Sequence, residues 1–118
     1  PIDGIIPVPL HPKKQNIRGY NQSDLLADGV ASELGIPVWK EALVRQKHNA
    51  TQTKKSRYQR YINSKEIFRV VQPDMLANKM VLLIDDVITT GATIETSGGA
   101  LLEVEGLKLC VASLAVAT

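Results

Sequence analysis

The chain has 118 residues, of which 44% are hydrophobic, and a formal net charge of +2. This length and apolar content predict one domain over residues 1–118, with its own core and no room for a second domain. No stretch reaches the roughly 18 apolar residues of a membrane span, and we see no secretory signal. The single cysteine, Cys110, excludes a disulfide framework within the chain, so we expect a cytoplasmic protein that contacts no membrane.

The first third of the chain predicts a strand, a loop and a helix. Residues 4–9 form an apolar run bracketed by prolines, which favours a short strand that leaves into a loop. Residues 21–35 repeat apolar side chains on one helical face and end in a glycine, which predicts a helix beginning near residues 21–23. Short strands are expected at residues 36–38 and 42–44, around Trp39, which we expect to pack in the core.

Positive charge is concentrated between residues 45 and 65. This stretch contains seven Lys and Arg side chains and no acid, so the rest of the chain is net negative. It lacks helical or strand periodicity before residues 58–62, and we therefore predict a mobile excursion, or lid, over about residues 45–64. Polyanions are the natural partners of such a segment.

The second half of the chain alternates strand and helix again. Strands are predicted at residues 67–71, 80–84 and 107–117, and a helix at residues 92–105. Cys110 falls in the last strand, where we expect it to be a small core residue. Alternating strands and helices predict an α/β fold, a single-domain parallel sheet with flanking helices on both faces.

Residues 81–93 are the most informative segment: Val-Leu-Leu-Ile-Asp-Asp-Val-Ile-Thr-Thr-Gly-Ala-Thr. A buried strand is predicted to end on two carboxylates, Asp85 and Asp86, which can accept hydrogen bonds from ribose hydroxyls or hold Mg²⁺ through water. Small residues at 89–93 then precede a helix, where backbone N–H groups and the helix dipole favour a phosphate. Together the two carboxylates and the phosphate-binding turn predict a ribose 5-phosphate site at the carboxyl end of the strand.

This segment resembles the phosphoribosyl pyrophosphate (PRPP) binding motif of type I phosphoribosyltransferases. Residues 8–14 (VPLHPKK), 18–22 (RGYNQ) and 51–63 are similar to the ComF-type members of that family. The resemblance implies a type I phosphoribosyltransferase-like (Rossmann-like) fold. Such members usually carry an amino-terminal cysteine-rich zinc module, which this chain does not contain, so the module is either trimmed from it or absent.

The resemblance also implies roles for individual residues. Asp85 and Asp86 would bind PRPP and Mg²⁺, and Arg57 in the lid would face the departing pyrophosphate; these three are the candidate catalytic residues. The remaining PRPP contacts would come from the loop after the first strand and from the motif: Leu10, His11, Pro12, Lys13, Val87, Thr89, Thr90, Gly91, Ala92 and Thr93.

Two functions remain open from the sequence. The first is a magnesium-dependent phosphoribosyltransferase that acts on PRPP and an acceptor the sequence does not identify. The second, favoured by the ComF resemblance, is an accessory protein of DNA uptake (competence), with little or no catalysis, that binds single-stranded DNA through its basic segment. A competence helicase and a second copy of the chain, as a homodimer, are the further partners considered.

Overall fold

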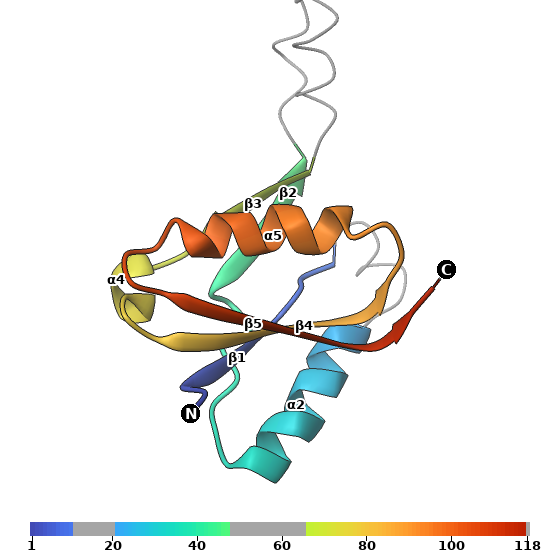
Figure 1. Cartoon of the computed structure of the whole chain (residues 1–118), viewed down its shortest axis with the longest axis horizontal. Helices are drawn as coiled ribbons and strands as arrows, with labels where there is room; N and C mark the ends of the chain where they lie inside the picture. The colour runs from blue at the N-terminus through green and yellow to red at the C-terminus, as the bar shows by residue number, and fades with distance from the viewer. Residues whose placement is uncertain (11–20, 48–65, 118) are drawn as a thin grey trace, which may run out of the picture.

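The computed structural model describes residues 1–10, 21–47 and 66–117 (Figure 1). No helix among these residues is long and apolar enough to cross a membrane. In chain order the elements are β1 (Gly4–Pro7), α2 (Gln22–Leu34), β2 (Leu43–Lys47), β3 (Glu66–Val70), α4 (Pro73–Leu76), β4 (Met80–Ile88), α5 (Ala92–Leu102) and β5 (Lys108–Val116).

A three-stranded parallel sheet, in the order β1-β4-β5, forms the centre of the molecule. Helix α5 lies on one face of this sheet and α2 on the other (Figure 1). The side chains of β4 alternate between the two faces. Val81 and Leu83 pack on the α5 side, whereas Leu82 and Ile84 pack with residues of α2. The predicted parallel sheet with helices on both faces is therefore confirmed.

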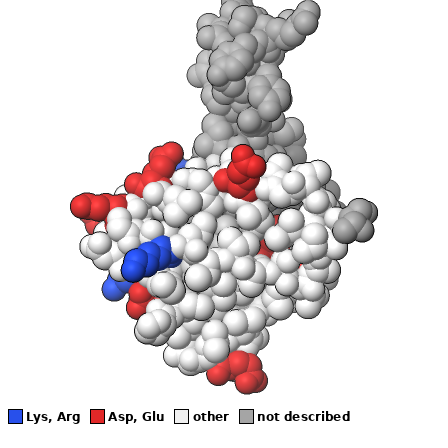
Figure 2. Space-filling model, in the orientation of Figure 1, with Lys and Arg blue, Asp and Glu red and all other residues white. Residues whose placement is uncertain are grey.

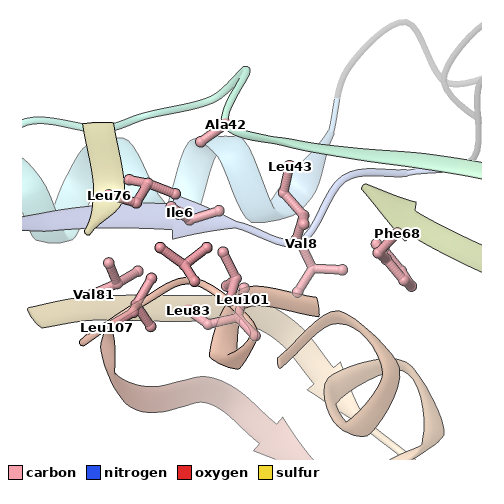
Figure 3. Packing of buried hydrophobic residues seen from close by; sticks show 11 residues of the cluster. Ile6, Val8, Ala42, Leu43, Phe68, Leu76, Val81, Leu83, Leu101 and Leu107 are labelled. Carbon is pink, nitrogen blue, oxygen red and sulfur yellow. The ribbon is translucent and has the colours of Figure 1, made fainter. Parts of the chain in front are cut away.

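The larger apolar cluster lies on the α5 side of the sheet and reaches the second sheet (Figure 3). Ile6, Leu83 and Leu101 are at most 1% exposed and join β1, β4 and α5. Leu43 and Phe68 bring β2 and β3 into the same cluster. Burial of these side chains fixes the carboxyl ends of β1 and β4 next to each other, because removing apolar surface from water drives such packing.

A two-stranded antiparallel sheet, β2–β3, corrects the predicted extent of the lid. Residues 45–47 were expected to belong to an irregular excursion, but they are strand and pair with residues 66–68. The polar sequence of residues 45–47 does not predict a strand, because it lacks the apolar alternation of a half-buried strand. Here the strand is held by pairing with its neighbour. The rest of the predicted lid, residues 48–64, lies outside the described residues.

The predicted ends of the helices hold with one adjustment. Helix α2 begins after Asn21 and stops at Gly35, whose φ of 69° is the left-handed conformation that ends helices. Helix α5 ends at Leu102 rather than at residue 105. Gly98 of this helix packs closely on the sheet, since a Cβ there would lie 3.1 Å from Leu109 Cδ2.

The last strand differs from its predicted environment. Cys110 is exposed, and Leu114 and Val116 are 75% and 63% exposed, so the prediction of a core cysteine is wrong. The even-numbered residues of β5 lie on the face of the sheet that α2 covers. Because α2 packs on β1 and β4, the side chains of Cys110, Leu114 and Val116 stay exposed. The surface of the molecule that faces the viewer, where β5 runs in Figure 1, carries few charged side chains in Figure 2.

Candidate functional site

The paired carboxylates lie within β4 rather than after it. The strand was expected to end at Ile84, but it continues through Asp85 and Asp86 to Ile88, because β5 pairs with it along this length. The buried half of the strand stops at Ile84, and both aspartates are half-buried. The side chains therefore stand at the carboxyl end of the buried sheet, where parallel α/β proteins bind ligands.

The loop after β4 leads directly into the amino end of α5. Gly91 is the residue before the helix and has a φ of 85°, a left-handed conformation that glycine adopts without a steric penalty. The Thr90 Oγ1 accepts a hydrogen bond from the Ala92 N–H at 3.2 Å. Gly91 offers no side-chain cap to the first turn, so the helix begins with backbone N–H groups and the positive end of its dipole.

A cavity of about 330 Å³ joins these parts. It brings together the end of β1, the start of α2, one residue of β2 and the motif after β4. Its described lining residues are Val8, Pro9, Leu10, Asn21, Gln22, Ser23, Arg45, Asp85, Asp86, Val87, Thr89 and Thr93. A small second cavity of about 30 Å³ lies beside it against Thr89, Gly91 and Thr93.

The first carboxylate is held in a fixed orientation. Asp85 Oδ1 accepts hydrogen bonds from the Ser23 hydroxyl at 3.3 Å and from the Asp86 N–H at 2.9 Å. Partial burial raises the pKa of the Asp85 carboxyl, and the neighbouring Asp86 side chain raises it further. Asp86 Oδ1 accepts from the Val87 N–H at 2.8 Å. One oxygen of each carboxylate is thus bound by the protein.

Asn21 and Ser23 connect the start of α2 to β4 and to the residue that follows β1, and neither was predicted as a site residue. Asn21 is 4% exposed; its Oδ1 caps α2 by accepting from the Ser23 N–H, and its Nδ2 donates to the Val8 carbonyl at 3.1 Å. Ser23, 3% exposed, reaches Asp85. The helix is thereby tied to both β1 and β4. A capping residue within the RGYNQ segment was the available signal.

Asn21→Ala should lower the free energy of unfolding by at least about 2 kcal/mol. A lost N-cap costs about 1 kcal/mol, and a buried carbonyl left without its donor costs about 1–3 kcal/mol. Urea denaturation followed by circular dichroism measures the change. The control, Ser32→Ala, alters an exposed residue of the same helix and should shift stability by less than about 0.5 kcal/mol. Equal stability of the two variants would show that the Asn21 network does not hold the helix.

Arg45 is a third unpredicted site residue, since it was expected only as part of the basic lid. It projects from β2 into the cavity, where its Nη1 donates to the Pro9 carbonyl at 3.3 Å and its guanidinium lies 5.3 Å from the centre of the Phe68 ring. The ring and the carbonyl orient the guanidinium. Arg45 thus places a cation in the same cavity as the two acids. Arg45 is placed in the cavity by the pairing of β2 with β3, and no local sequence pattern predicts that pairing.

The predicted site residues divide into two groups. The structure brings together Asp85, Asp86, Val87, Thr89, Thr93 and Leu10 around the larger cavity, and Gly91 lines the smaller one. Thr90 and Ala92 form the intervening turn. The ligand-binding roles of all these residues stay predictions. Four predicted residues, His11, Pro12, Lys13 and Arg57, lie outside the described part of the chain.

Comparison with known proteins identifies the family. Residues 22–118 match the model of the phosphoribosyl transferase domain. The chain belongs to this family. Over 93 residues it is 42% identical to competence protein F of Haemophilus influenzae, and over 99 residues it is 31% identical to competence protein ComFC of Bacillus subtilis. It is also 37% identical over 92 residues to the DNA utilization protein YhgH of Escherichia coli K12. The phosphoribosyltransferase domain is therefore of the ComF type.

The alignments cover most of this chain but less of its relatives. They include 78% of the chain and 41% of competence protein F, 84% and 38% for ComFC, and 78% and 40% for YhgH. The chain thus spans about two fifths of the length of these curated relatives.

Solved structures confirm the fold of the phosphoribosyltransferase domain. A purine phosphoribosyltransferase from Pyrococcus horikoshii superimposes with a TM-score of 0.62 at 19% identity, covering 98% of this chain and 62% of that one. The glutamine PRPP amidotransferase of B. subtilis gives 0.64 at 21% identity, with 97% and 22% coverage. The expected type I phosphoribosyltransferase-like fold is therefore confirmed.

Proposed function

We propose that the chain binds PRPP with Mg²⁺ and transfers the phosphoribosyl group to an acceptor with release of pyrophosphate. The observation that carries this proposal is the shared cavity, which is lined by two carboxylates and by Thr89 and Thr93 from either side of the glycine-containing turn that begins α5. Carboxylates accept hydrogen bonds from ribose hydroxyls, and the helix start favours the 5-phosphate. Membership of the phosphoribosyltransferase family supports the same assignment.

The donor set fits Mg²⁺. Asp85 and Asp86 are hard oxygen donors, and each has one carboxylate oxygen engaged by the protein in the described contacts, which leaves the other for a ligand. Mg²⁺ is commonly held by one or two carboxylates together with water and substrate phosphates. When bound, the ion would neutralise charge on the departing pyrophosphate. The Ser23 hydroxyl would keep the Asp85 carboxylate oriented, because it holds one of its oxygens.

Arg45, from strand β2, supplies positive charge to the same cavity. A guanidinium binds phosphate oxygens through paired donors, and burial on one side strengthens such contacts. We assign Arg45 to the pyrophosphate, next to the loop that follows β1, since its Nη1 already contacts the Pro9 carbonyl in that loop. Charge developing on the leaving group would then be stabilised by both the guanidinium and the metal.

Titration calorimetry with PRPP tests the proposed function directly. Binding should be observed with Mg²⁺ and should weaken strongly when EDTA removes the ion. Ribose 5-phosphate should bind more weakly, since it lacks the pyrophosphate that the ion and Arg45 would contact. A folded protein that binds neither compound with Mg²⁺ would contradict the proposal.

Arg45→Ala should weaken PRPP binding by at least about tenfold, because hydrogen bonds to charged groups contribute about 1.5–3 kcal/mol. The matched control is Arg69→Ala. Arg69 is an exposed cation on the paired strand β3, where it pairs with Val44, so its side chain lies on the opposite face of the ribbon from Phe68 and Arg45. Calorimetry under identical salt conditions should leave the control within about twofold. Equal losses in both variants would indicate a general charge effect.

A second candidate function follows from the named relatives, which are competence and DNA utilization proteins. We propose single-stranded DNA as the alternative ligand, with the basic stretch of residues 45–65 as its contact. Salt dependence separates the two functions. Affinity for an oligonucleotide should fall steeply between about 50 and 200 mM salt as counterions are released. PRPP binding should instead depend mainly on Mg²⁺.

A further inference from the structure

A cavity of about 450 Å³ lies between residues 38–42 and residues 71–75. It lies at the end of the central sheet where the parallel strands begin. The Trp39 ring packs on Gly4 at the start of β1, and α4 immediately precedes the start of β4. In Figure 1, α4 and the amino end of α5 lie at opposite ends of the sheet. None of the described residues lines both this cavity and the one that contains the acids.

The cavity is lined by an aromatic residue, other apolar residues and a few polar groups. Trp39 and Met75 supply an indole ring and a thioether, and Met75 is 45% exposed. Gln72 and Glu41 add an amide and a carboxylate to the lining. Five of its eight described lining residues are apolar, and cavities of this size that combine apolar side chains with a few polar ones are typical of sites for small organic molecules. An indole face with adjacent hydrogen-bonding groups suits a planar heterocycle.

The charge of the cavity argues against a phosphorylated ligand. Lys40 is the only cation among the described lining residues, and its Nζ forms an ion pair with Asp28 on α2 at 2.9 Å. Glu41 contributes an exposed carboxylate, which would repel a phosphate. An uncharged ligand is therefore favoured, and a donor on it would find an acceptor in Glu41.

Gln72 is held in a conformation that its sequence disfavours. Its φ and ψ are 57° and 61°, which is left-handed, and it precedes Pro73, a position that favours extended backbone. The Gln72 carbonyl accepts from the Met75 N–H at 3.0 Å, so the conformation belongs to the turn that begins α4. Strained residues persist where the surrounding structure holds them, and they concentrate at ligand sites.

From these features we infer that this cavity binds an uncharged nucleobase that carries an exocyclic amine. The base stacks on Trp39, its amine donates to the Glu41 carboxylate, and its ring nitrogen accepts from the Gln72 amide. The base belongs either to a free nucleoside or to single-stranded nucleic acid. Both sources present the same planar group, and the test distinguishes them.

Fluorescence provides the test, because Trp39 is the only tryptophan of the chain. Adenosine and cytidine should quench its emission in a saturable way, whereas uridine, which lacks the amine, should bind about three- to tenfold more weakly. A short oligo-deoxyadenosine quenching at lower base concentration than adenosine would identify nucleic acid as the source. Because no phosphate contact is involved, the nucleoside affinity should be unchanged between about 50 and 200 mM salt.

Gln72→Gly tests the specific residue, and Asn78→Gly is its matched control. Both replace a residue of positive φ, 57° and 62°, and Asn78 does not line the cavity. Each glycine should raise the melting temperature by relieving the backbone. Only Gln72→Gly should weaken quenching by adenosine, by about three- to tenfold.

Two results would overturn the inference. The first is no saturable quenching by either nucleoside or by the oligonucleotide. The second is quenching that Gln72→Gly leaves unchanged while it raises the melting temperature, which would reduce the residue to a structural role. Far-UV circular dichroism serves as an independent control of folding and is expected to be unchanged in both variants.

Discussion

Replacing Asp85 and Asp86 with asparagine should lower the affinity for PRPP in the presence of Mg²⁺ by at least about 100-fold. Each carboxylate would contribute a charged hydrogen bond worth about 1.5–3 kcal/mol, and 1.4 kcal/mol corresponds to a factor of ten. Asparagine preserves the side-chain oxygen that accepts from Ser23 and from the backbone, so the local structure should persist. Calorimetry with and without Mg²⁺ measures the loss.

Asp74→Asn is the matched control for this pair, because Asp74 is an exposed aspartate on α4, away from the acids of the candidate site. Its PRPP affinity should stay within about twofold of the parent chain, since it removes one negative charge without touching the site. If the control and the double variant weakened binding equally, the effect would be one of net charge, and the site would have to lie elsewhere.

The stability of Asp85→Asn should follow from the pKa shift. Burial raises the pKa of Asp85 above its ordinary value of 3.8. The protonated carboxyl therefore stabilises the fold at pH values below 3.8, and this stabilisation is lost as the pH rises through the raised pKa. At neutral pH the half-buried, charged carboxylate lowers the free energy of unfolding, and the uncharged asparagine removes this destabilisation. Asp85→Asn should thus melt at a temperature equal to or above that of the parent chain, and the difference should shrink in acid. A lower melting temperature at pH 7 would contradict this account.

Local signals in the sequence predicted the elements that position the motif. The apolar run through Ile84 predicted the buried part of β4, and the periodicity up to Gly35 predicted α2. These predictions succeed because residues three or four apart in a helix, or adjacent in a buried strand, carry the pattern themselves. The exact end of β4 was missed because it depends on pairing with β5, which is far away in the chain.

Long-range contacts position the site residues that local sequence patterns did not predict. Ser23 and Asp85 are 62 positions apart, and Arg45 and Pro9 are 36 positions apart. Neither pair leaves a periodic signal. Cys110 was misplaced for a related reason: an apolar strand pattern predicts burial on both faces, but α2 packs mainly on β1 and β4 and leaves Cys110 of β5 exposed. Strand identity is local, whereas coverage of a strand is a property of the whole fold.

Gly91→Val should reduce PRPP affinity by roughly 100-fold. A β-branched residue is strained at the φ of 85° found here, so the turn would change shape and its N–H groups would leave the phosphate. Loss of two charged hydrogen bonds, at about 1.5–3 kcal/mol each, accounts for the magnitude. A valine at the observed conformation would otherwise meet no neighbour, because nothing lies within 4 Å of its Cβ position. Calorimetry with ribose 5-phosphate isolates the phosphate contribution.

Gly35→Val separates this effect from general destabilisation. Gly35 also has a left-handed φ, 69°, and open space around its Cβ position, but it ends α2 at the opposite end of that helix from Asn21. Both valine variants should lose about 1–2 kcal/mol of stability, since an L-residue in this conformation costs that much. Only Gly91→Val should also lose affinity for PRPP and ribose 5-phosphate. If both variants bound as tightly as the parent chain, the turn before α5 would not be the phosphate site, because its backbone geometry would be irrelevant to binding.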